Sequence, residues 1–289
     1  MKVFGSSLTR LLAGIALGLV FGVSGVAYAG IAATKHNLSS SGTGSNHTTG
    51  TDQICVFCHT PHGSDTSAAV PLWNRKLAAG SSYSVYNSTA ATATSTIDGQ
   101  IGAVGSVSLA CLSCHDGAQA MDNVLNKPGS GGYNATGSQI GGTWTGSATM
   151  SGTPIPVLGT DLTNDHPIGI QYCGGGLTGA AGTVSGTCKD GDFIGPAVRA
   201  DSHFASAVVK TKDINSTAVF WVETGTVNTT REKTDISLYN RSDVVGFTGP
   251  SVECGSCHDP HVESKASDNI MFMRVTTAGS AICLSCHVK

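Results

Sequence analysis

The chain has 289 residues, with 16 lysines and arginines against 19 aspartates and glutamates and a formal net charge of −3 at pH 7. Because these charges are scattered, with no basic patch, the sequence disfavours nucleic acid as a partner. Glycine is abundant, at 38 residues, and only 6% of residues are aromatic. Side chains alone therefore offer limited means of offsetting the entropy of ordering the chain.

Residues 1–29 are predicted to be a secretory signal peptide. Lys2 and Arg10 form a positive n-region, an apolar stretch follows, and Ala27-Tyr28-Ala29 is a small-x-small cleavage site. A retained membrane anchor is the alternative, since Leu11 to Ala29 could just cross a bilayer, but the cleavage site favours removal. We therefore expect residues 30–289 to form a single exported unit without a membrane anchor.

Residues 30–54 are predicted to form a short polar arm. The arm carries His36, in TKHNLSS, and His47, in SGTGSNHTTG. Whether either histidine is a haem ligand can be judged only after the motifs that follow them.

Residues 55–129 and 251–289 each hold two copies of the pattern C-x-x-C-H, which accounts for eight of the ten cysteines. The copies are Cys55, Cys58 and His59; Cys111, Cys114 and His115; Cys254, Cys257 and His258; and Cys283, Cys286 and His287. Residues i and i+3 share a helix face, so both thiols can reach the vinyl groups on one porphyrin edge while the histidine binds the iron. One copy could be a zinc or redox site. Four copies behind an export signal predict four covalently bound haem c groups.

Two of the remaining histidines stand in matching places, His62 in CHTPH and His261 in CHDPH. Three residues of chain cannot wrap round a porphyrin, so neither histidine can reach the far face of its own haem. Each is instead predicted to bind the iron of a neighbouring haem, which would hold two haems close together. A surface histidine is the alternative, which the repetition of H-x-P-H disfavours.

Residues 130–250 form a long segment rich in Gly, Ser and Thr. His166, in NDHPIG, is expected to be a distal ligand because Pro167 holds the preceding residue extended, and His36 is expected to be another. His203 and His47 are expected to face solvent. Cys173 and Cys188 lack the rest of a haem motif and are expected to form a disulfide, a pair of free thiols being the alternative.

Short strands are predicted within the same segment, at TAVFWVE and DISLYN. Met271 and Met273, further along the chain, could supply sulfur ligands, but packing against a ring is the simpler interpretation because histidines suffice. Four covalently tethered apolar rings could form the core that side chains do not supply, so regular structure should be sparse.

The sequence resembles the doubled C-x-x-C-H multihaem cytochromes, most of all the extracellular tetrahaem nanowire cytochromes of metal-reducing bacteria (outer-membrane cytochrome E type). The resemblance is carried by CVFCHTPHG, CHDPH, DHPIG and KHNLS and runs from His36 to His287. It implies a fold that is mostly coil, with few short helices and strands wrapped around a stacked haem chain. It also implies head-to-tail polymers in which a histidine of one subunit ligates a haem of the next.

If every iron takes two histidines, no coordination position remains for a substrate, so we expect electron transfer and no enzyme activity. The main hypothesis is a secreted conduit at the cell surface or beyond it. Its partners would be copies of itself, upstream periplasmic or outer-membrane cytochromes, and an extracellular electron acceptor. A soluble periplasmic shuttle and a multihaem reductase with one open haem position are the alternatives. His36 is the expected donor across a subunit boundary, with His166 or His62 as alternative donors.

Overall fold

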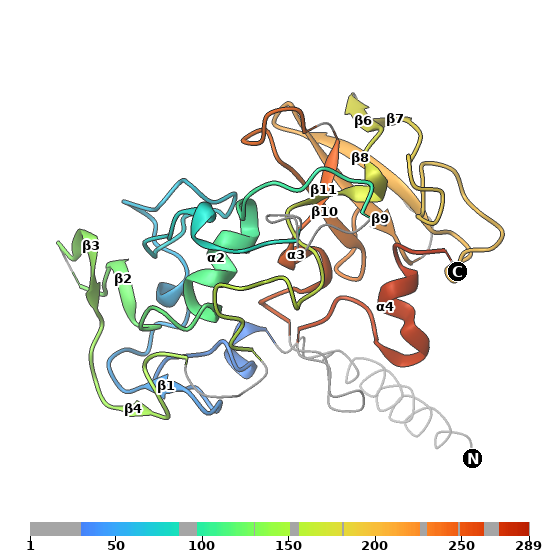
Figure 1. The fold of residues 1–289 in the computed structure, drawn as a ribbon. Helices are drawn as coiled ribbons and strands as arrows, with labels where there is room; N and C mark the ends of the chain where they lie inside the picture. Colours follow the sequence, from blue (N-terminus) through green and yellow to red (C-terminus); the bar gives the residue numbers. More distant parts are fainter. Residues whose placement is uncertain are drawn as a thin grey trace, which may run out of the picture.

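The computed structural model describes residues 30–86, 97–129, 131–150, 156–180, 182–225, 230–247, 249–262 and 272–288. The predicted signal peptide, over residues 1–29, and Met271 lie outside these ranges. Most of the described backbone is coil, as expected, and its regular elements are short (Figure 1). Within the described ranges, α-helix is confined to α2 (Ser106–His115), α3 (Cys254–Cys257) and α4 (Ala281–Leu284). Single 3-10 turns cover Ile31–Ala33, Cys55–Phe57, Gly80–Ser82, Tyr172–Gly174 and Ala278–Ser280.

The largest sheet is antiparallel, with five strands in the order β5-β11-β10-β9-β8. Its strands are β5 (Ile170–Gln171), β8 (Val208–Ile214), β9 (Thr217–Glu223), β10 (Ile236–Asn240) and β11 (Pro250–Val252). Two-stranded ladders join β1 (His47–Thr48) to β4 (Trp144–Thr145), β2 (Asn123–Asn126) to β3 (Tyr133–Gln139), and β6 (Leu177–Ala180) to β7 (Thr183–Gly186). The strands predicted at TAVFWVE and DISLYN are confirmed as β9 and β10.

The β8–β9 hairpin shows why this part of the Gly/Ser/Thr-rich segment is regular. Ile214 pairs with Thr217, so only Asn215 and Ser216 form the turn, and both have positive φ angles of 48° and 61°. Two positive φ angles define the type I′ turn, whose twist matches that of the flanking strands. The β-branched and aromatic residues of β9 then supply a strand that suits burial on a pleated surface.

A side-chain core accompanies the five-stranded sheet. Buried members of this cluster include Tyr172, Leu177, Ile194, Val209, Phe220, Val222, Ile236 and Leu238. The expectation that haems would replace a side-chain core is therefore wrong for this half of the molecule. The composition of the whole chain did not predict this core, because its apolar residues are concentrated in and around the strands.

The N-terminal arm, residues 30–54, is packed onto the fold, whereas the sequence predicted a polar arm whose His36 would act across a subunit boundary. Leu38 belongs to an apolar cluster with Val56, Phe57 and Met121. The buried Asn37 donates from Nδ2 to the Ala32 carbonyl at 2.8 Å. Strand β1 also pairs with β4, about a hundred residues later in the chain. The arm is therefore held against its own subunit.

A buried arginine joins the segment after the first C-x-x-C-H motif to helix α2. Arg75 is fully buried and donates from Nε to Ser113 Oγ (3.1 Å) and from Nη2 to the Ser113 carbonyl (2.8 Å). Its Nη1 donates to the Met121 carbonyl at 2.7 Å. A buried guanidinium left without such acceptors would be costly. Arg75 thus fixes the first and second motifs relative to each other.

The predicted disulfide is confirmed. Cys173 and Cys188 are bonded, with their Cα atoms 5.3 Å apart and a sequence separation of 15. Close backbone approach accompanies the bond at Gly176, which has a φ of 94° and where a Cβ would collide with the Thr187 carbonyl. The bond closes a glycine-rich loop against the sheet core, to which both cysteines contribute.

Among the described residues, the helices are too short or too polar to cross a lipid bilayer.

Replacing both Cys173 and Cys188 by serine should lower the free energy of unfolding by about 3 kcal/mol, because the loop would be unconstrained in the unfolded chain. Thermal or denaturant unfolding of the oxidised protein and of the double variant would measure the difference. The visible absorption spectrum should be unchanged, since neither residue belongs to a C-x-x-C-H motif. A changed spectrum with unchanged stability would contradict this structural role.

Candidate functional site

Each C-x-x-C-H motif occupies a turn of helix that places its histidine beside its cysteines. The backbone N–H of His59 donates to the Cys55 carbonyl (2.8 Å), that of His258 to Cys254 (3.1 Å) and that of His287 to Cys283 (2.9 Å). His115 closes helix α2. Bonds from residue i to i−4 are those of an α-helical turn, so both cysteines and the histidine of each motif lie within one turn, as attachment to one macrocycle requires.

Backbone carbonyls orient the imidazoles of His59, His115 and His36. The Nδ1 of His59 lies 2.8 Å from the Pro71 carbonyl oxygen, that of His115 2.8 Å from the carbonyl of Pro156, and that of His36 3.0 Å from the carbonyl of Pro260. A carbonyl can only accept, so these nitrogens carry the proton. The lone pair of each ring is then on Nε2, the nitrogen available to bind iron.

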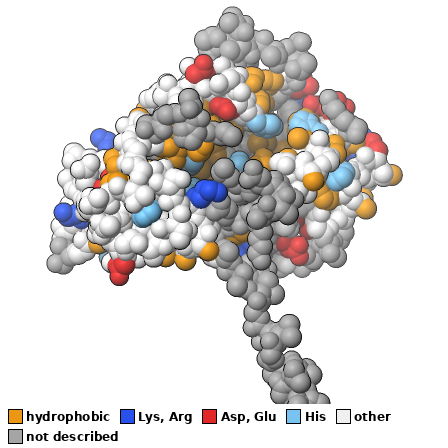
Figure 2. All heavy atoms as spheres, turned by 90° about the horizontal axis from the view of Figure 1, so that it is seen from below, with side chains coloured by type: hydrophobic (Ala, Val, Ile, Leu, Met, Phe, Trp, Pro, Cys, Tyr) orange, Lys and Arg blue, Asp and Glu red, His pale blue; other side chains and the backbone are white. Residues whose placement is uncertain are grey.

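The structure places these three histidines and His261 in two pairs. The ring centroids of His36 and His115 lie 6.1 Å apart, and those of His59 and His261 also lie 6.1 Å apart. A metal bonded at about 2 Å to a nitrogen of each of two imidazoles holds the centroids about 6 Å apart. The donor atoms and the spacing therefore fit an iron with two imidazole ligands. In the view of Figure 2, histidine side chains gather around a hollow with hydrophobic walls.

The second ring of one pair has a charged partner. Nδ1 of His261 lies 3.3 Å from Oδ1 of Asp259, and Oδ2 of Asp259 lies 3.6 Å from Nη1 of Arg274. The hydrogen bond with His261, together with the charge of Arg274, lowers the pKa of Asp259 to about 2. The carboxylate is therefore ionised at neutral pH.

His36 is the predicted ligand whose position differs most from expectation. It lies against His115 of its own chain, and the Phe272 ring stacks on it with centroids 4.2 Å apart. We expected His36 to be the donor across a subunit boundary. That expectation is corrected by the packing of residues 30–54, which directs His36 inward.

The other predicted ligands are not gathered into such pairs among the described ring contacts. His62 and His166 are exposed, and Nδ1 of His166 lies 3.0 Å from the Pro167 carbonyl. His287 packs against Phe193, with ring centroids 4.3 Å apart. Their ligand roles, like that of His258, remain predictions. Of the two histidines expected to face solvent, His203 is exposed and His47 is half-buried in β1.

Cysteines of successive motifs are neighbours. Burial raises the pKa of the Cys58 thiol to about 12, and the nearby Cys114 adds to the shift. A hydrogen bond between the side chains of Cys111 and Cys254 raises the pKa of Cys111. Burial raises the pKa of Cys257 to about 11, with Cys283 among the contributing charges. The four attachment sites therefore adjoin in chain order, and Figure 1 shows α2, α3 and α4 following one another across the molecule.

A buried polar network fixes the junction between the second and third motifs. Ser108 of α2 donates to Glu253 Oε2 at 2.5 Å and accepts the Cys254 N–H at 3.0 Å. Arg241 donates from Nη1 to Glu253 Oε1 at 3.0 Å. Burial raises the pKa of Glu253, and the paired guanidinium offsets part of that cost. The network anchors α3 on α2.

The first and third motifs are followed by the same hairpin, a repeat that sequence reasoning recognised only in H-x-P-H. The N–H of Thr60 donates to the Leu72 carbonyl, and that of Asp259 to the Phe272 carbonyl, each at 2.8 Å. Leu72 and Phe272 have positive φ angles of 57° and 61°. In both hairpins a second backbone hydrogen bond returns to the second cysteine of the motif. The N–H of Asn74 donates to the Cys58 carbonyl, and that of Arg274 donates to the Cys257 carbonyl.

Side chains at the two equivalent positions complete the repeat. Nδ2 of Asn74 donates to the Val56 carbonyl at 2.6 Å, and Nε of Arg274 donates to the Gly255 carbonyl at 3.0 Å. Each carbonyl belongs to the residue after the first cysteine of its motif. An asparagine and an arginine thus stabilise the same turn in the two hairpins. Because their side chains differ, comparing the two sequence segments does not show that Asn74 and Arg274 are equivalent.

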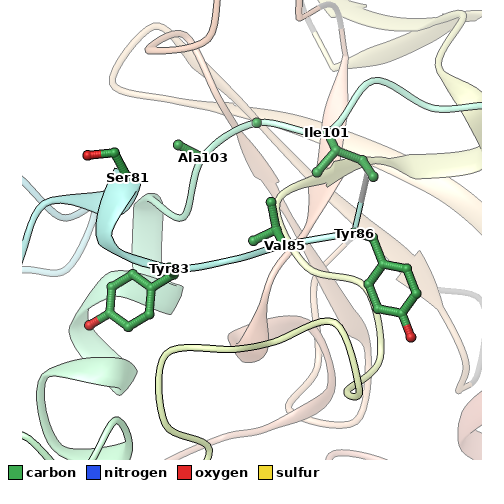
Figure 3. A pocket seen from close by; sticks show the side chains of 7 residues that line it. Ser81, Tyr83, Val85, Tyr86, Ile101 and Ala103 are labelled. Carbon is green, nitrogen blue, oxygen red and sulfur yellow. The ribbon is translucent and has the colours of Figure 1, made fainter. Parts of the chain in front are cut away.

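A cavity of about 310 Å³ lies near helix α2 and is lined by Ser81, Tyr83, Val85, Tyr86, Ile101, Gly102 and Ala103. Figure 3 shows the Tyr83 ring turned toward the helix, where its hydroxyl donates to Asp116 Oδ2 at 2.9 Å. Because its lining contains neither histidine nor cysteine, we assign no haem to this cavity.

A family model for the doubled CXXCH motif matches residues 249–289. The match covers the third and fourth motifs, and the repeated hairpin extends the same local structure to the first. No curated protein matches the chain.

Replacing His36 or His261 by alanine should leave the haems attached but remove one low-spin bis-imidazole signal from the electron paramagnetic resonance spectrum of the oxidised protein. The two variants should affect different irons, because His36 faces His115 and His261 faces His59. His203→Ala is the matched control and should change nothing. An unchanged spectrum in either test variant would contradict the pairing.

Proposed function

We propose that this multihaem c-type cytochrome, whose doubled motif indicates electron transfer, carries four haems and conducts electrons outside the cell as a subunit of a head-to-tail filament. The single observation that supports it best is the chain of attachment sites, which adjoin in sequence order. Bound haem would supply reversible one-electron chemistry at each site. The protein supplies anchoring cysteines, paired imidazoles and close spacing.

The ligand set favours conduction over catalysis. Two imidazoles that face each other at 6.1 Å on either side of an iron leave that iron no position for a substrate. His62 and His166 are proposed as the second ligands of the remaining irons, those held by His258 and His287. With every iron six-coordinate, a transferred electron changes only the iron oxidation state.

Both ends of the row of attachment sites are accessible. Cys55 of the first motif and Cys283 of the fourth are exposed, whereas the other motif cysteines are only partly exposed. A conduit needs this arrangement, because electrons must enter and leave through terminal haems near the surface. A head-to-tail contact would bring the last haem of one subunit close to the first haem of the next.

His62 is the proposed donor across the subunit boundary, in place of His36. It is exposed, and its counterpart in the other hairpin, His261, already faces a motif histidine. Two exposed apolar side chains belong to the same region: Leu72 is 50% exposed, and Tyr133, whose ring lies beside Gly63, is 57% exposed. A histidine flanked by exposed apolar surface suits a heterologous contact, which propagates as an open filament.

The test is to produce His62→Ala and His47→Ala with the normal haem-attachment machinery, count haems per chain, and image the secreted material by electron microscopy. The wild type and His47→Ala should carry four haems and form filaments. His62→Ala should keep four haems but give short oligomers with one high-spin iron per chain. His166→Ala in parallel tests the alternative donor.

Other outcomes would support the competing functions. A wild-type protein that elutes as a monomer in size-exclusion chromatography at all concentrations would indicate a soluble shuttle. Binding of carbon monoxide to the ferrous wild type would reveal an open coordination position and favour a reductase. Full-length filaments of His62→Ala would contradict this histidine as the donor while leaving the conduit intact.

A further inference from the structure

The carboxylate of Asp259 stands behind the His261 imidazole. Its Oδ1 lies 3.3 Å from His261 Nδ1 and also accepts the His261 backbone N–H at 3.0 Å. The Asp259 side chain is 17% exposed, and its other oxygen lies 3.6 Å from Arg274 Nη1. The turn of the chain between the two residues thus holds the carboxylate and the ring in a fixed relation.

The contacts differ at four other predicted ligands. The Nδ1 atoms of His36, His59, His115 and His166 lie against neutral backbone carbonyls. In the first hairpin the residue equivalent to Asp259 is Thr60, whose hydroxyl donates to the His62 carbonyl at 2.9 Å. The two hairpins therefore have the same backbone hydrogen bonds, but the hairpin after the third motif carries a carboxylate at Asp259 where the first hairpin has the neutral Thr60.

A carboxylate that accepts the Nδ1 proton of a metal-bound imidazole makes the ring a stronger electron donor. A stronger donor stabilises ferric iron more than ferrous iron, so it lowers the reduction potential of that haem. His261 faces His59 rather than the histidine of its own motif. The charge at residue 259 would therefore act on a haem attached about two hundred residues earlier in the chain.

We infer that Asp259 is a positioning residue that, through His261, lowers the reduction potential of the haem attached to Cys55 and Cys58. The inference rests on the proposed ligation of that haem by His59 and His261. Arg274 opposes the effect in part, because its guanidinium approaches the same carboxylate. The carboxylate thus makes the first haem more reducing than it would be without it, whereas the His36 and His115 rings of the second haem lie against neutral carbonyls.

The test is a spectroelectrochemical titration of Asp259→Asn, with Asp259→Ser as a second variant. Serine carries no charge but keeps an oxygen that can accept the His261 backbone N–H. The serine variant should therefore retain the turn even if the asparagine variant does not. In both variants the potential of one haem should rise by about 59 mV, the equivalent of a tenfold change in a one-electron equilibrium. Asp65→Asn is the matched control, since it removes a charge from the first hairpin without a described contact to an imidazole.

A double variant separates action through His261 from a general charge effect. In a His261→Met background, Asp259→Asn should no longer shift the potential, because the coupled ring is gone. The same shift in both backgrounds, or equal shifts from Asp65→Asn and Asp259→Asn, would overturn the inference.

The remaining outcomes distinguish the inference from its premise. If His261→Met leaves the electron paramagnetic resonance spectrum unchanged, the proposed ligation fails and the inference fails with it. If His261→Met removes one bis-imidazole signal but neither Asp259 variant moves any potential, only the role of Asp259 is overturned.

Discussion

The short distance along the chain between His258 and His261 is the constraint on which the arrangement of the candidate haem sites depends. His258 belongs to the third motif, His261 faces His59 of the first, and the Pro260 carbonyl orients His36, which faces His115 of the second. Four consecutive residues thus contact three sites. Because the backbone between them can change length by only a few ångströms, the sites cannot separate without breaking one of these contacts.

Buried polar networks also hold the motifs in place relative to one another. Arg75 joins the segment after the first motif to α2 through Ser113, and Glu253 joins α2 to α3 through Ser108. Both side chains are buried, where a charged group is tolerated only with well-placed partners. The hairpin repeat adds the same turn twice, with Asn74 and Arg274 at equivalent positions. The electron-transfer chemistry therefore rests on a scaffold that is mostly coil but densely hydrogen-bonded.

The parts of this arrangement that are local in sequence could be predicted, and the parts that depend on topology could not. Cysteines three residues apart and a following histidine define a haem motif within one helical turn, and the composition of β9 predicts a strand. The pairing of His261 with His59 joins residues about two hundred positions apart, and no local pattern encodes it. The position of His36 was misjudged for the same reason, because the burial of the nearby Leu38 depends on distant neighbours such as Phe57 and Met121.

The separation between His59 and His261 also bears on how the protein is made. Ribosomes add about 5–20 residues per second, so roughly 10–40 s pass between synthesis of the first motif and synthesis of the imidazole that faces it. The first motif is therefore complete in the growing chain long before His261 exists. The first haem motif to be synthesised is among the last to gain its facing imidazole. A premature stop codon late in the gene would leave a coloured, haem-bearing chain whose first haem lacks its partner imidazole.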